Sequence, residues 1–215
     1  LVLACLAYWR ASPTRGILLC SLAAVLAVLT PWTIRNAIEF HRLIPVRDDF
    51  GLELAVSNNA DATPDLYANI RTPYAHQHHP FDGLKPALAV EAAGGEAGYS
   101  DRMLHEALTW IFTHPRRFAI LAIERNVEFW APVSRYRWHA AGMAFVTLLA
   151  FGGWSALWRT ARPAAWVLIA VPLSYSLTFL AVEVCIRYTY PVYWSLLLPA
   201  AALVGAFSGR NSVRC

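Results

Sequence analysis

The residues best suited to chemistry stand beside the ends of apolar segments, and Glu183 and Arg187 form the clearest pair, four residues apart. This spacing puts both side chains on one face if a helix continues through them. One interpretation is a structural ion pair at the end of a membrane span, with long side chains reaching toward the interface. The other is a phosphate site, because a guanidinium is permanently charged and can hold phosphate oxygens through two donors. In that case Glu183 orients Arg187, and Tyr188 is a neighbouring donor or an interfacial anchor.

A second basic residue, Arg35, follows another apolar segment and offers the same two interpretations, helix-end anchor or phosphate contact. The adjacent Asn58 and Asn59 could hydrogen-bond sugar hydroxyls, or they could stabilise a turn. The run His76-Gln77-His78-His79 supplies imidazoles, which are good metal ligands. Because no matched cluster of further ligands accompanies it, we predict no metal site and no cofactor. His114 precedes a proline and is expected to cap a helix rather than act as a base.

The composition is that of a membrane protein. The 215 residues are 57% hydrophobic and 15% charged, with a mean hydropathy of +0.40, whereas soluble chains are about one-quarter charged. This excludes a disordered chain, a nucleic-acid-binding domain and a small disulfide-stapled fold. The net charge of +4 is weak evidence for an acidic partner, because richness in Arg and Ala can reflect genome composition. The four cysteines show no metal or disulfide spacing and are interpreted as small hydrophobic residues.

Four stretches are long enough to cross a bilayer, which needs about 20 apolar residues. They contain no Asp, Glu, Lys, Arg or His, and they are residues 16–34, 141–158, 164–182 and 191–208. Residues 1–9 are also apolar but cover only about 13 Å at 1.5 Å per residue, less than half of a bilayer. Because the chain starts at Leu rather than Met, we interpret this stretch as the stump of a span in a longer polytopic protein, of which this chain is a fragment.

The charge distribution predicts how the spans face. The short connections 10–15, 159–163 and 209–215 each carry two Arg and no acid, whereas 13 of the 14 acids lie in residues 35–139. By the positive-inside rule the three Arg-bearing connections are cytoplasmic. The sequence therefore predicts an all-α membrane protein, a polytopic helical bundle in three parts. Residues 1–34 hold the truncated span and the second span, residues 35–140 form an outward segment, and residues 141–215 hold three spans and a short cytoplasmic tail.

The outward segment is expected to be mixed and partly helical. Residues 43–59 are predicted as an irregular excursion with one strand, because residues 52–56 alternate in polarity, and residues 60–98 mainly as loop. From Ser100, which we place at the N-cap, a helical period runs to His114, and Pro115 opens a second helix that ends at Trp130. The second helix is too charged to span and suits the outer membrane surface. A soluble helix pair that packs on its own loop is the alternative.

Three groups of residues, in this order, resemble one family. The first is Thr30-Pro31-Trp32-Thr33-Ile34-Arg35-Asn36, followed by Phe40, Pro45, Gly51 and Asn58-Asn59. The second is Gly95-Glu96, Tyr99, Glu106-Ala107-Leu108-Thr109-Trp110-Ile111, His114-Pro115-Arg116-Arg117-Phe118 and Phe129-Trp130. The third is Glu183, Arg187-Tyr188 and Pro191. This order is similar to the C-terminal half of bacterial integral-membrane glycosyltransferases of the dolichyl-phosphate-mannose protein mannosyltransferase type, which share the multi-span C-type fold with lipid A aminoarabinose transferase.

The resemblance implies a multi-pass enzyme of the bacterial inner (plasma) membrane that moves a sugar from a polyprenyl-phosphate donor to an acceptor at the outer face. The implied partners are that donor and the lipid bilayer, with no nucleic acid. Such enzymes keep their catalytic acid in the first outward loop, to which no position here corresponds, so the activity of this chain alone is left open. In an enzyme of this kind, Arg187, Arg35 and Tyr188 would contact the lipid phosphate and Glu183 would orient Arg187. Asn58 and Asn59 would contact the sugar.

Two other functions remain as alternatives. A non-catalytic membrane scaffold would use the outward helices to bind a partner, and composition does not exclude it. A transporter component usually carries ionisable groups inside its spans, and the four predicted spans have no Asp, Glu, Lys, Arg or His. The transporter is therefore the weaker alternative.

Overall fold

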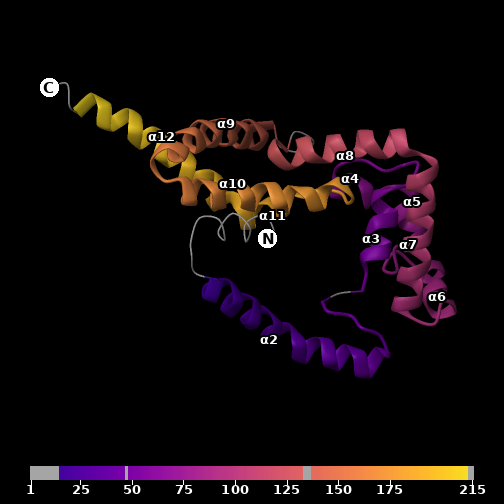
Figure 1. The fold of residues 1–215 in the computed structure, drawn as a ribbon. Helices are drawn as coiled ribbons and strands as arrows, with labels where there is room; N and C mark the ends of the chain where they lie inside the picture. The colour runs from indigo at the N-terminus through magenta and orange to yellow at the C-terminus, as the bar shows by residue number, and fades with distance from the viewer. Residues whose placement is uncertain (1–14, 47, 133–136, 213–215) are drawn as a thin grey trace. The chain divides into compact units, whose positions relative to one another are not determined.

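The computed structural model describes residues 15–46, 48–132 and 137–212, and within these residues every regular element is a helix. Figure 1 shows the order of these helices along the chain. The all-α class predicted from the sequence is confirmed.

Four helical stretches have the length and apolarity of membrane spans. They cover 22, 24, 19 and 22 residues, and at 1.5 Å per residue each is about as long as the roughly 30 Å hydrocarbon core of a bilayer is thick. The first three spans lie in α2 (Arg15–Phe40), in α9 (Arg137–Thr160), and in α10 (Arg162–Ser176) with η1 (Leu177–Leu180). The fourth, Ile186–Phe207, runs through α11 (Ile186–Thr189) and η2 (Tyr190–Val192) into α12 (Tyr193–Ser212). They match the four predicted spans, and residues 1–9 lie outside the described residues.

The chain divides into two compact units. In the described residues, unit 1 comprises residues 15, 124–132, 137–180 and 184–212, and unit 2 comprises residues 16–46, 48–123 and 181–183. Unit 1 holds three of the membrane-length helices, and unit 2 holds α2 together with the helices that follow it as far as the first half of α8 (Pro115–Trp130).

Unit 1 is a bundle in which α9 packs against α12 and α10. The buried positions of α9 recur every three or four residues, which makes one continuous seam along the helix. The seam consists of Ala140, Met143, Thr147, Ala150, Gly153 and Trp154. At Gly153 the backbones meet, because a Cβ at this position would lie 1.8 Å from the carbonyl oxygen of Pro199 in α12.

Unit 2 is built from short helices around α7 (Glu96–Thr113). The predicted loop over residues 60–98 is wrong in large part, because this stretch holds α4 (Leu66–Asn69), α5 (Pro73–His78) and α6 (Leu84–Ala92). Two of these short helices carry N-caps. The Asp65 carboxylate accepts from Ala68 N at 3.1 Å, and the Thr72 hydroxyl accepts from Ala75 N at 3.2 Å, so polar residues that suggested a loop start helices.

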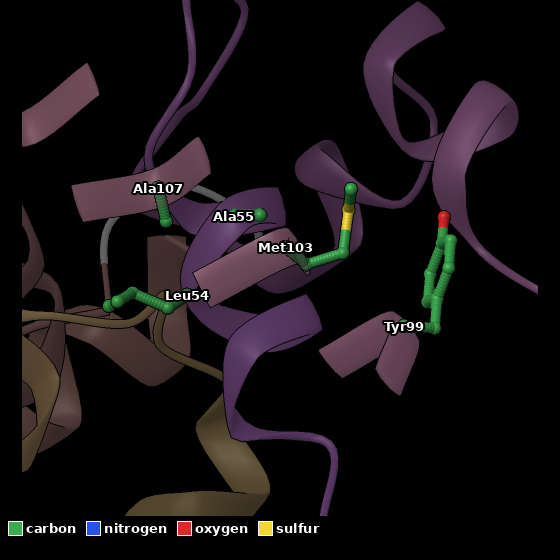
Figure 2. Packing of buried hydrophobic residues seen from close by; sticks show 5 residues of the cluster. All are labelled: Leu54, Ala55, Tyr99, Met103 and Ala107. Carbon is green, nitrogen blue, oxygen red and sulfur yellow. The ribbon is translucent and has the colours of Figure 1, made fainter. Parts of the chain in front are cut away.

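The predicted strand over residues 52–56 is also wrong, because these residues lie in α3 (Phe50–Ser57). Gly51, Leu54, Ala55 and Asn58 are buried at the helical spacing i, i+3, i+4, i+7, and the intervening residues 56 and 57 are buried too, so burial here is not confined to the alternate residues of a strand. Figure 2 shows Leu54 and Ala55 of α3 together with Met103, Ala107 and Tyr99 of α7, and these five residues form a buried hydrophobic cluster of unit 2.

The prediction that Ser100 caps the long helix is wrong, because α7 begins at Glu96. Gly94 and Gly95 precede it with φ of 80° and 103°, a backbone region that favours glycine, and they separate α6 from α7. Ser100 lies inside α7, where its hydroxyl oxygen accepts a hydrogen bond from Gly51 N at 3.2 Å. The residue therefore ties α7 to α3.

The start of the second helix at Pro115 is confirmed, since α8 runs from Pro115 to Trp130. Its position along the membrane surface stays a prediction. Its charged side is not simply solvated, because Arg125 and Glu128 are buried. Within unit 1, the Arg125 guanidinium donates to the carbonyl oxygen of Leu180 at 3.3 Å.

Candidate functional site

Arg187 lies on α11, the second residue of the membrane-length stretch that continues through η2 into α12, and its side chain is exposed. Its guanidinium carbon is 5.5 Å from the ring centroid of Tyr188, within the range of a cation–π interaction. The Tyr188 ring in turn stacks on Phe179, with centroids 5.9 Å apart and planes at 16°. The guanidinium is thus presented at the end of a span beside an aromatic support.

The support is a cluster of four rings in unit 1. Phe179 stacks on Phe129 at 5.4 Å and meets Tyr175 edge-on at 5.6 Å, and Tyr188 completes the set. Sequence analysis missed this cluster, because its members come from α8, α10, η1 and α11. The available signal was the i, i+4 spacing of Tyr175 and Phe179.

Glu183 does not share a helix with Arg187, which corrects the premise of their predicted pairing. The helical stretch ends at Leu180 and α11 starts at Ile186, so the four-residue spacing puts no common face through them. Glu183 is buried, belongs to unit 2, and its backbone N–H donates to the Ser57 hydroxyl at 3.0 Å. The predicted role of Glu183 in orienting Arg187 assumed a shared helix face, and this assumption is not met.

Arg35 lies near the end of α2 with an exposed side chain. Its guanidinium carbon is 5.3 Å from the centroid of a Trp32 ring, and Nη1 donates to the Asn36 side-chain oxygen at 3.2 Å. These contacts fit the predicted anchor at the helix end. A phosphate contact by Arg35 remains a prediction. Because Arg35 belongs to unit 2 and Arg187 to unit 1, the two are not assigned to one site.

Asn58 and Asn59 are buried and hold the end of α3. The Asn58 amide donates to the carbonyl oxygens of Leu54 and Ala181, both at 2.8 Å. The Asn59 amide donates to Ala55 and Val56 carbonyl oxygens at 2.9 and 2.8 Å, and its side-chain oxygen accepts from Asp61 N at 2.9 Å. These bonds describe the turn-stabilising alternative, and they leave the predicted sugar contacts without support.

The histidine run makes local contacts. His76 Nδ1 lies 3.0 Å from a carboxylate oxygen of Asp82, and His78 stacks on Tyr74 with centroids 4.1 Å apart. Among the residues that the structure describes, no group of His, Cys, Asp and Glu could hold a metal ion. The Tyr74 hydroxyl donates to Glu106 at 2.7 Å, and its pKa is raised, first by burial and then by this carboxylate.

His114 follows the last residue of α7, as the expected cap. Its Nδ1 lies 3.1 Å from the carbonyl oxygen of Trp110, and the two rings stack with centroids 5.0 Å apart. These contacts fit a structural role at the junction of α7 and α8.

Unit 2 contains a cavity of about 190 Å³ that sequence analysis did not anticipate. The polar residues of its lining, which carry groups able to accept hydrogen bonds, are Asp48, Asp49, Glu53, His79, Glu96, Tyr99 and Ser100. Burial raises the pKa of Tyr99, whose hydroxyl donates to the His78 carbonyl oxygen at 2.6 Å. The lining comes from three separate parts of the chain, and the Asp48-Asp49 pair was the one local signal.

Comparisons with protein-family models, with curated proteins and with solved structures find no match for this chain. Its function is therefore inferred from the chemistry of its own residues and from the resemblance of its motifs.

Proposed function

We propose that this protein acts in glycosyl transfer at a membrane, moving a sugar from a polyprenyl-phosphate donor to an acceptor at the outer face, with Arg187 as a contact of the donor phosphate. The observation that supports this most is the exposed guanidinium on α11, in the first turn of a membrane-length stretch and beside Tyr188. The phosphate of a membrane-anchored donor rests at the level of the lipid headgroups, where such a cation is useful.

The chemistry assigns Arg187 a binding and charge-stabilising role. The oxygen of an acceptor hydroxyl forms the new bond to the sugar C1 while the bond from C1 to the phosphate oxygen breaks, and polyprenyl phosphate leaves with its electron pair. The hydroxyl proton passes to a general base that is not among the residues assigned here. A guanidinium can hold two phosphate oxygens at once and offset the charge that develops there. Tyr188, whose ring lies beside the guanidinium, would be a second donor or an interfacial anchor.

We predict that Arg187→Ala weakens polyprenyl phosphate binding about tenfold to hundredfold, since a hydrogen bond to a charged group is worth roughly 1.5–3 kcal/mol. Arg187→Lys should be milder, because it keeps the charge and loses the fork. Binding is measured with the purified protein in nanodiscs, and the polyprenol without phosphate serves as the neutral ligand. Arg159→Ala is the matched control, since Arg159 is an exposed residue in the last turn of α9.

Sugar transfer from a labelled polyprenyl-phosphate donor, measured in membranes of the producing cells, tests the activity itself. We expect it to fall with Arg187→Ala and to persist with Arg159→Ala. Unchanged donor affinity in a folded Arg187→Ala variant would remove Arg187 from the site. A lack of polyprenyl phosphate binding by the unaltered protein would favour a scaffold.

The same proposal places the protein in the bacterial inner membrane with the helices of residues 50–123 outside and the α9–α10 connection in the cytoplasm. A cysteine at Asp82, an exposed position of unit 2, should react with a membrane-impermeant thiol reagent on intact cells. A cysteine at the exposed Thr160 should react after the cells are opened. Both single-cysteine variants need the four native cysteines removed. The opposite labelling pattern would refute this orientation.

A further inference from the structure

The chain segment after α2 turns back along the helix that it has just left. His41 follows Phe40, the last residue of α2, with a φ of 52°, the left-handed conformation that commonly ends helices and reverses the chain. The Trp32 indole N–H then donates to the Val46 carbonyl oxygen at 3.1 Å, and the Asn36 amide donates to the Ile44 carbonyl oxygen at 2.9 Å. Residues 43–46 are thus hydrogen-bonded to the side of α2.

These bonds fix the depth of the segment. Arg35 is the first charged residue after the apolar run of α2, and Trp32 lies three residues before it. On a helix that crosses the bilayer, this separation puts Trp32 about 4.5 Å closer to the bilayer centre. The Val46 carbonyl oxygen is hydrogen-bonded to the Trp32 indole, so Val46 lies at the level of the apolar part of the span.

The side chains of the segment suit that environment. Leu43 is 79% exposed and Val46 is 63% exposed in the structure, whereas Ile44 is buried. Residues 43–46 carry no charged side chain, and Pro45 has no backbone N–H. The carbonyl groups of Ile44, Pro45 and Val46 accept hydrogen bonds from donors on α2, which lowers the cost of placing this irregular backbone at the end of a span.

We propose that residues 43–46 form a re-entrant segment whose exposed Leu43 and Val46 side chains contact lipid at the outer end of the α2 span. The occupant of this apolar surface is the bilayer, because the surface continues the lipid-facing side of α2, where Val28 is 76% exposed. Arg42 marks the polar end of the segment, since its guanidinium pairs with Asp101 of α7 at 2.6 Å. The proposal depends on α2 as a membrane span and is independent of any sugar transfer.

The test uses nitroxide labels on single cysteines in the full chain, reconstituted in phosphatidylcholine vesicles after removal of the native cysteines. Labels at Leu43 and Val46 should collide with oxygen in preference to a water-soluble nickel chelate. Their oxygen-to-chelate ratio should be several-fold higher than at Asp82, the aqueous reference, and should approach the ratio at Val28. A ratio at Val46 equal to that at Asp82 would overturn the proposal.

A second variant tests the attachment to α2. Trp32→Phe keeps an aromatic ring and removes the N–H that holds the Val46 carbonyl. We expect the chelate accessibility at Val46 to rise several-fold in this variant while the accessibility at Val28 stays the same. No change at Val46 would show that the indole bond does not hold the segment, and an equal rise at Val28 would point to a general loosening of α2.

Discussion

Replacing Gly153 with alanine is expected to lower the free energy of unfolding by roughly 2–4 kcal/mol. The added Cβ would lie 1.8 Å from the Pro199 carbonyl oxygen and 2.9 Å from its Cα, so it meets backbone that no rotamer change can move. The α9 and α12 backbones must separate, and the contacts along their seam weaken together. Close backbone approach at small residues is a main source of helix association in membranes. Unfolding in mild detergent, followed by tryptophan fluorescence, measures the loss.

Gly142→Ala is the matched control for Gly153→Ala. Gly142 lies on the same helix, and a Cβ built there meets no atom within 4 Å. Alanine is favoured over glycine inside a helix by about 1 kcal/mol, so this variant should be as stable as the parent or slightly more stable. Equal destabilisation by both substitutions would show that the contact with Pro199 is not the cause.

The spans could be predicted from the sequence because each is a long apolar run whose meaning does not depend on its neighbours. Length and apolarity suffice when the solvent is a bilayer. The start of α8 was predictable for a similar reason, because proline fits the first turn of a helix and is disfavoured at most other helix positions.

The helices of unit 2 could not be predicted in the same way. α3 has only eight residues, and the alternation over residues 52–56 is too short to distinguish a strand from a helix. Its burial is decided by α7, more than forty residues later in the chain. Ser100 illustrates the same limit, because a serine suits an N-cap, whereas here its hydroxyl serves a neighbouring helix.

Of the candidate site, the sequence predicted only that Arg187 and Tyr188 lie near a span end, and both lie in the first turn of a membrane-length stretch. Their phosphate contacts stay predictions. The spacing of Glu183 and Arg187 suggested a shared helix face, but the chain leaves the helix after Leu180, and Glu183 is bonded to Ser57 of α3. A contact across more than a hundred residues leaves no local signature in the sequence.

Gly51→Ala should destabilise unit 2 by a similar amount, roughly 2–4 kcal/mol. A Cβ at Gly51 would lie 1.9 Å from the Ser100 carbonyl oxygen and 2.9 Å from Leu104 N, so α3 must move away from α7. That movement opens the core between Leu54 and Met103. Hydrogen exchange followed by mass spectrometry should show faster exchange in peptides from α3 and α7, with peptides from α9 unchanged.

Two companion variants separate the steric cause from the hydrogen bond. Ser100→Ala removes only the acceptor of the Gly51 N–H and should cost about 1 kcal/mol. Because Gly51→Ala collides with the Ser100 backbone, adding Ser100→Ala to it should not restore slow exchange. Gly16→Ala, placed in open space on α2, should leave exchange in α3 unaltered. Slow exchange in α3 of Gly51→Ala would mean that the two helices do not approach as closely at this position as the structure places them.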